Sequence, residues 1–210
     1  MGQSGETPRP LVFAWAAVLT HSHGVPQWRP RDATIWSERA PRGNGSFMNK
    51  ITPFLWFDDQ AEAAVAHYLK IFENGEILSM RHYPADLSGP SRVMSITFAI
   101  AGQELIAFNG GPHFKFTEAV SLFVDCHTQR EVDTLWEQLS AGGATGRCGW
   151  LKDKFGLSWQ IIPRALAVLL QHKDHNKAER VMQAMMQMSK IDIDKLQEAA
   201  DSPSCTVAGT

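Results

Sequence analysis

The chain has 210 residues, of which 44% are hydrophobic and 20% charged, and its formal net charge is −2 at pH 7. These values exclude a disordered, collagen-like or coiled-coil chain. The small net charge gives no sign of a nucleic-acid partner or an anionic lipid surface. We therefore expect a soluble, cytoplasmic protein of one large domain or two small ones, with no nucleic-acid or membrane partner.

The first 47 residues differ from the rest because they combine five Pro and three Trp with no Lys and no sustained apolar period. Their apolar run Leu11–Leu19 has nine residues, which is too short to span a bilayer. A signal peptide is one interpretation, but Thr20–His23 is a poor cleavage site. The alternatives are a disordered extension or a stretch that precedes the native start codon. We expect residues 1–47 to lie outside the folded domain.

From residue 48 onward the chain repeats one pattern at an offset of 67 residues. Phe54–Asp59 aligns with Ser121–Cys126, and each is a short apolar run typical of a buried strand entering a turn. Apolar residues at i, i+3, i+4 and i+7 follow each run and predict one buried helix face. These residues are Val65, Tyr68, Leu69 and Phe72 in the first copy and Val132, Leu135, Trp136 and Leu139 in the second. The sequence therefore predicts two copies of one module.

Each predicted helix is followed by segments with strand character. They are Glu76–Tyr83, Ser91–Ile100 and Gln103–Phe108 in the first copy, and Gly149–Asp153 and Leu157–Ile162 in the second. The order is therefore a strand, a helix and two or three more strands, twice over. This order predicts an α+β protein with mainly antiparallel sheets and a cleft where the sheets bury each other or meet a second subunit.

The pattern becomes helical after Pro163. The helical stretches are Ala165–Gln171, Asn176–Ser189 and Ile191–Ala200, and the second carries a row of methionines. Methionines at helical spacing are typical of a core or a dimer face. We expect residues 164–200 to form a helical segment for packing or dimer contact, and residues 201–210 to form a frayed C-terminus.

Several separated motifs resemble one protein family. They are Ile51–Asp58, Asn109–Pro112, Ser121–Val124, Cys148–Asp153, Phe155–Gln160 and Met188–Asp192. On these motifs, residues 48–200 resemble the PhnB-like branch of the glyoxalase/bleomycin-resistance/dioxygenase (vicinal oxygen chelate) superfamily. Members of this branch often carry the label 3-demethylubiquinone-9 3-methyltransferase. The resemblance implies paired βαβββ modules, here residues 48–113 and 117–163, and a homodimer in which each pair of modules forms a ligand cleft.

The resemblance also implies positions for a metal. Superfamily enzymes hold a divalent metal with His or Glu from four strands, and the metal stabilises an enolate. Carried over to this chain, the positions are Ile51 or Thr52, Ile106, Glu118 or Ala119, and Gln160. Isoleucine cannot bind a metal, and Thr and Gln are weak ligands. We therefore expect no cofactor. The alternative is a divalent metal bound by Glu118 and Gln160, or in another way through His82 or His113.

The methyltransferase label is not supported by the residues. Common enzymes that use S-adenosylmethionine place a glycine-rich turn between a strand and a helix. Here Gly110–Gly111 precedes Pro112, and Gly142–Gly146 does not lie in such a setting. Whether the chain is an enzyme therefore stays open. The alternatives to a protein that only binds are a metal-dependent lyase, isomerase or dioxygenase, and the methyltransferase that the family label names.

The favoured interpretation is that the cleft binds a small, partly apolar molecule. The candidate ligand-binding residues are Trp56, Asn109, His113, Trp150, Trp159 and Gln160. The tryptophans would form a flat apolar floor, unless they fill the core. Gln160 lies in an apolar strand, so its amide is tied either to backbone or to a ligand. Asn109 and His113 flank a loop at a strand end, and His113 is also the candidate acid or base, unless it is a surface histidine.

Overall fold

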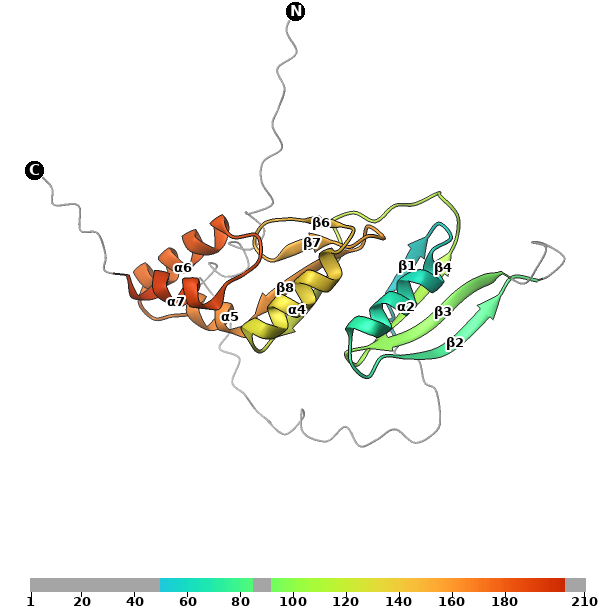
Figure 1. The fold of residues 1–210 in the computed structure, drawn as a ribbon, viewed down its shortest axis with the longest axis horizontal. Helices are drawn as coiled ribbons and strands as arrows, with labels where there is room; N and C mark the ends of the chain where they lie inside the picture. The colour runs from blue at the N-terminus through green and yellow to red at the C-terminus, as the bar shows by residue number, and fades with distance from the viewer. Residues whose placement is uncertain (1–49, 85–91, 203–210) are drawn as a thin grey trace, which may run out of the picture. The chain divides into compact units, whose positions relative to one another are not determined.

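The computed structural model describes residues 50–84 and 92–202 (Figure 1). The predictions for residues 1–47 and for the chain end beyond residue 202 lie outside these ranges. In the part of the chain that is described, none of the helices combines the length and the apolar character that a membrane span needs.

The first module has the predicted order of a strand, a helix and three more strands (Figure 1). Its elements are β1 (Phe54–Phe57), α2 (Ala61–Ile71), β2 (Glu76–His82), β3 (Val93–Ile100) and β4 (Gln103–Asn109). They form a sheet in the order β1-β4-β3-β2, and α2 lies on one face of it. β1 runs parallel to β4, whereas β4, β3 and β2 are antiparallel to one another.

The second module repeats this arrangement. Its elements are β5 (Ser121–Cys126), α4 (Gln129–Ser140), β6 (Ala144–Thr145), β7 (Trp150–Lys152) and β8 (Ser158–Pro163). The sheet order is β5-β8-β7-β6, with β5 parallel to β8 and the other pairs antiparallel. The two βαβββ modules are thus confirmed, and each sheet is mixed. The parallel pair arises because the helix crosses over before the last strand returns beside the first.

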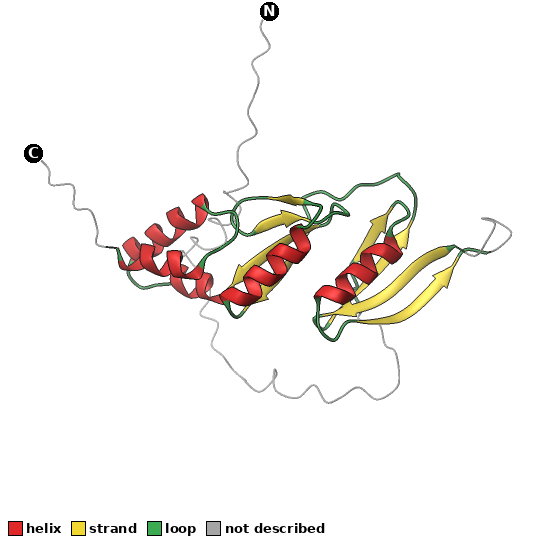
Figure 2. Ribbon diagram, viewed as in Figure 1, coloured by secondary structure: helices red, strands yellow, loops and turns green. Residues whose placement is uncertain are grey.

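The C-terminal segment is helical, as predicted (Figure 2). It consists of α5 (Arg164–Leu170), α6 (His175–Gln187) and α7 (Ile193–Asp201). Backbone hydrogen bonds hold the turn between α6 and α7 against the second module. The amides of Cys148 and Gly149 donate to the carbonyls of Met188 and Ser189, each over 2.8 Å.

Strand alternation decides which side chains each sheet buries. In the first module Leu55, Phe57, Leu105 and Ala107 are buried beneath α2, and in the second Trp159 and Ile161 are buried beneath α4. The predicted helix faces are confirmed, because each supplies buried apolar residues to this core. The alternate residues point away from the helix. We call this second side of each sheet its open face.

Candidate functional site

The open face of the first sheet carries four packed aromatic rings. Phe54 and Trp56 lie in β1, Phe108 lies beside them in β4, and Phe114 follows β4 in a loop. Phe108 is 5.4 Å from Phe54 and 4.9 Å from Trp56 between ring centroids, and Phe114 is 4.9 Å from Trp56. Phe54 is 55% exposed and Phe114 66% exposed. We call these four residues the aromatic cluster. An exposed apolar patch of this kind marks a place of interaction.

The loop after β4 holds Trp56 in position. The Trp56 indole Nε1 donates to the carbonyl of Gly111 over 2.9 Å. Gly110 lies directly against the ring, because a Cβ atom there would be 2.2 Å from Trp56 Cζ2. Glycine is therefore needed at position 110, because only glycine lets the backbone lie this close to the Trp56 ring. This contact explains the first glycine of the Gly-Gly-Pro motif.

The Asn109 side chain joins elements within the first module and does not lie on the open face. Its side chain is buried, and its Oδ1 accepts from the amide of Ala61 over 2.9 Å. Its Nδ2 donates to Glu62 Oε2 over 2.6 Å and to the Val93 carbonyl over 3.1 Å. The side-chain amide thus links β4 to α2 and β3. His113 lies nearby in sequence and is exposed.

The open face of the second sheet brings two predicted site residues together. Trp150 of β7 pairs with Gln160 of β8, which pairs with Phe123 of β5, so the three side chains form one row. Phe123 is 52% exposed, and the other two are half-buried. The Gln160 Nε2 donates to the Ser121 hydroxyl over 2.8 Å, so a side chain of β5 accepts from the amide.

Trp159 points the other way, into the core, because it neighbours Gln160 on the same strand. It is 1% exposed, and its Nε1 donates to Asp153 Oδ2 over 2.8 Å. The buried Asp153 carboxylate also accepts from the Tyr68 hydroxyl over 2.7 Å and from the amides of Phe155 and Leu157 over 2.9 and 3.1 Å. Burial, and secondly the Asp153 charge, raise the pKa of Tyr68 far above its ordinary value.

Sequence reasoning missed Asp153 as the centre of a buried network. A signal was present, because an aspartate shortly before a Phe-Gly turn is a residue type that binds the backbone amides of such turns. His67 lies beside this network, and its Nε2 is buried with no hydrogen-bond partner in the described ranges. Burial, and secondly the nearby Lys154, lower the pKa of His67. Tyr68, Asp153 and Trp159 are buried, and His67 is half-buried beside them.

The residues at the metal positions that the resemblance implies do not fit a metal. Ile106 is apolar, and the Gln160 amide donates to Ser121. Glu118 forms an ion pair of 2.5 Å with Lys152 Nζ, whose hydrogen bond lowers the pKa of the carboxyl. Among residues 50–84 and 92–202, no three His, Cys, Asp or Glu side chains gather in a group that could hold a metal ion.

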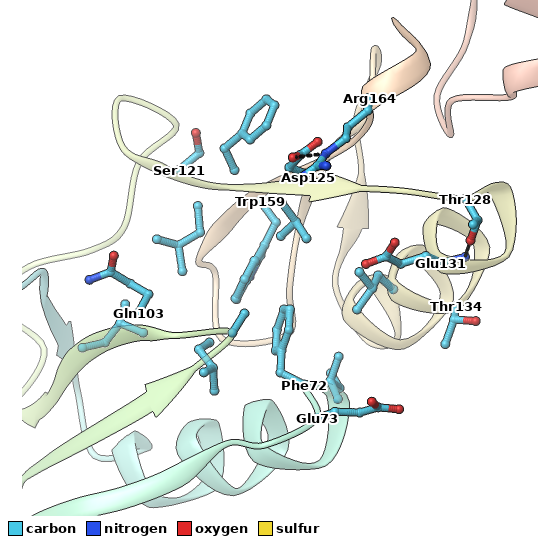
Figure 3. Close-up of a pocket in the computed structure, with 18 of the residues that line it drawn as sticks. Phe72, Glu73, Gln103, Ser121, Asp125, Thr128, Glu131, Thr134, Trp159 and Arg164 are labelled. Carbon is cyan, nitrogen blue, oxygen red and sulfur yellow. Dashed lines mark hydrogen bonds and ion pairs between the residues drawn. The ribbon is translucent and has the colours of Figure 1, made fainter. Parts of the chain in front are cut away.

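A cavity of about 890 Å³ lies between the two modules (Figure 3). β5, the start of α4, the end of α2 and the turn between β3 and β4 supply its walls. Trp159 and Phe72 line it with rings that are nearly parallel, at 22°, and 5.6 Å apart. Arg164 and Asp125 also line the cavity and form an ion pair of 2.6 Å. Of the predicted site residues, Trp159 alone lines this cavity.

Comparisons with known proteins show a family and several solved structures to which the chain is similar. The model of the family described as 3-demethylubiquinone-9 3-methyltransferase matches residues 49–162. The PhnB protein of Bacillus cereus is 36% identical over 55% of this chain and 99% of its own, with a TM-score of 0.51. A protein from Staphylococcus aureus is 33% identical over 54% of this chain and 95% of its own, with a TM-score of 0.27.

A third structure is the fosfomycin resistance protein FosX of Listeria monocytogenes, solved with Mn(II) and a sulfate ion. It is 17% identical over 54% of this chain and 89% of its own, with a TM-score of 0.39. None of the curated proteins compared with the chain matches it. The family match covers more than half of the chain, and the PhnB protein matches along almost its full length. The chain therefore belongs to the 3-demethylubiquinone-9 3-methyltransferase family, with PhnB-like relatives and the glyoxalase fold.

Proposed function

We propose that the protein binds a small, partly apolar molecule at the open faces of its sheets. The observation that carries this proposal is the exposure of large rings on both faces. Phe54 and Phe114 are 55% and 66% exposed on the first sheet, and Phe123 is 52% exposed on the second. Rings left in water cost free energy, and a flat ligand that covers them recovers it.

The proposal includes a homodimer. One molecule of ligand can cover only part of the two open faces, and a second copy of the chain would cover the remainder. The cleft would then lie between an aromatic cluster and the row of Phe123, Gln160 and Trp150. The polar pair of Gln160 and Ser121 would give this apolar cleft a specific hydrogen-bonding point.

The proposal is for binding and assigns no reaction. His113 is exposed, and Glu118 is paired with Lys152. The methyl transfer in the family's description is therefore not assigned to any residue of this chain.

The neutral compound naphthalene-2-carboxamide tests the proposal by calorimetric titration of the full chain. Phe54→Ser should weaken binding about tenfold, because it removes an exposed ring of the aromatic cluster. The matched control is Val168→Ser, since Val168 is an exposed apolar residue of α5, outside both open faces. It should bind the compound as the wild type does.

Equal affinity of the wild type and Phe54→Ser would contradict the proposed binding face. The dimer is tested on the same samples by sedimentation equilibrium. The wild type should sediment as a dimer, and Phe123→Ser should shift the equilibrium toward monomer. A wild type that stays monomeric, with and without the compound, would rule out the cleft between two copies.

A further inference from the structure

The first sheet's open face changes in chemistry from one edge to the other. Trp56 of β1 pairs with Phe108 of β4, Phe108 pairs with Ser95 of β3, and Ser95 pairs with Arg81 of β2. Directly paired residues project to the same side of a sheet. One row across four strands therefore runs from two rings through a hydroxyl to a guanidinium group.

The neighbouring row shows the same change. Phe54 pairs with Ile106, Ile106 with Thr97, and Thr97 with Ser79. Two apolar side chains are thus followed by two hydroxyl groups. The open face is apolar beside β1 and polar beside β2, so it matches a ligand that has one apolar end and one polar end.

Arg81 makes the polar end of this face cationic. Arg81 is exposed, and no carboxylate of residues 50–84 and 92–202 forms an ion pair with it. Its cross-strand neighbour Ser95 is neutral. By contrast, Lys152 on the other sheet's open face is paired with Glu118. An arginine without a carboxylate partner has donors available for an anion, and its planar group suits two oxygens at once.

We propose that the ligand is an amphiphile with a flat apolar group and an anionic group, such as a carboxylate, sulfonate or phosphate. The apolar group lies on the aromatic cluster, and Arg81 binds the anionic group. This inference rests on the proposed function and names the class of molecule bound there. Three strand spacings separate the backbones of Trp56 and Arg81 by about 14 Å. The long arginine side chain shortens that gap, and the hydroxyls of Ser95 and Ser79 lie beside it as further donors.

Two compounds of nearly equal shape test the proposal, naphthalene-2-carboxylate and its neutral amide, naphthalene-2-carboxamide. The wild-type chain should bind the carboxylate about tenfold more tightly than the amide, because a charged hydrogen bond is gained. Arg81→Gln should bind the two compounds with equal affinity. Arg81→Lys should keep most of the preference, since it keeps the charge but loses the planar fork.

The matched control is Arg130→Gln, which removes an exposed arginine of α4 that lines the cavity between the modules, away from the first sheet's open face. This variant should keep the full preference for the carboxylate. Equal binding of the two compounds by the wild type would overturn the inference and leave the proposed function standing. A preference that survives Arg81→Gln, or that disappears in Arg130→Gln, would also overturn it. If neither compound binds, the proposed function and the inference fail together.

Discussion

Replacing Asp153 with alanine should lower the free energy of unfolding by about 3–5 kcal/mol, because four donors, three of them buried, lose their acceptor. The donors are the Tyr68 hydroxyl, the Trp159 indole and the amides of Phe155 and Leu157. These groups come from α2, from the turn before β8 and from β8 itself, so the loss affects both modules. Chemical denaturation of the wild type and Asp153→Ala measures this difference.

Two further variants distinguish the loss of the Asp153 hydrogen bonds from the effect of removing any one donor or any carboxylate. Tyr68→Phe removes one donor and leaves the carboxylate in place, so it should cost only about 1 kcal/mol. Asp59→Ala removes an exposed carboxylate before α2 and should change stability by less than about 0.5 kcal/mol. An Asp153→Ala protein as stable as Asp59→Ala would show that the network does not hold the modules.

Gly149→Ala should lower the free energy of unfolding by about 3 kcal/mol, because the backbone would be strained and the added Cβ atom would overlap with neighbouring atoms. Gly149 has a φ of +82°, a backbone conformation that other residues adopt at a cost. A Cβ atom there would lie 2.8 Å from the carbonyl oxygen of Ile161 and 2.6 Å from Ile162 Cδ1. Because the amide of Gly149 also binds Ser189, a shift here would loosen the C-terminal helices. Denaturant midpoints measure the loss.

Gly156 provides the matched control for this position. Its φ is +87°, but a Cβ atom there would meet nothing within 4 Å. Gly156→Ala should therefore lower the free energy of unfolding by only about 1 kcal/mol, which is the cost of placing alanine at a positive φ. Equal losses in the two variants would mean that the contact with Ile161 and Ile162 adds nothing at position 149.

Much of the fold could be predicted because the repeat at 67 residues combines strand, turn and helix signals. The strand β6 was missed because it has only two residues, Ala144 and Thr145, beside a glycine pair. A stretch this short has no alternation that a periodicity analysis can detect. The parallel pairs of β1 with β4 and β5 with β8 depend on how the chain crosses over, which local pattern does not specify.

The candidate site was harder to predict, because the face of the sheet on which a side chain lies depends on strand register. Trp159 and Gln160 were both proposed as ligand contacts, but neighbours on a strand project to opposite faces. Strand alternation alone therefore allowed only one of them to face a cleft. Arg81 lies within a predicted strand, and only its register with Ser95 and Phe108 shows that it shares a face with Trp56. Asn109 is a buried link because partners from distant elements surround it.

The most direct test of binding at the open faces is fluorine NMR of the full chain labelled with 5-fluorotryptophan. Resonances are assigned by single Trp-to-Phe substitutions, and the protein is titrated with naphthalene-2-carboxylate. We expect the signals of Trp56 and Trp150 to shift, since both lie on open faces, and those of Trp136 and the buried Trp159 to stay in place. Shifts confined to Trp159 would place the ligand in the cavity between the modules. Both that result and the absence of any shift would contradict the account.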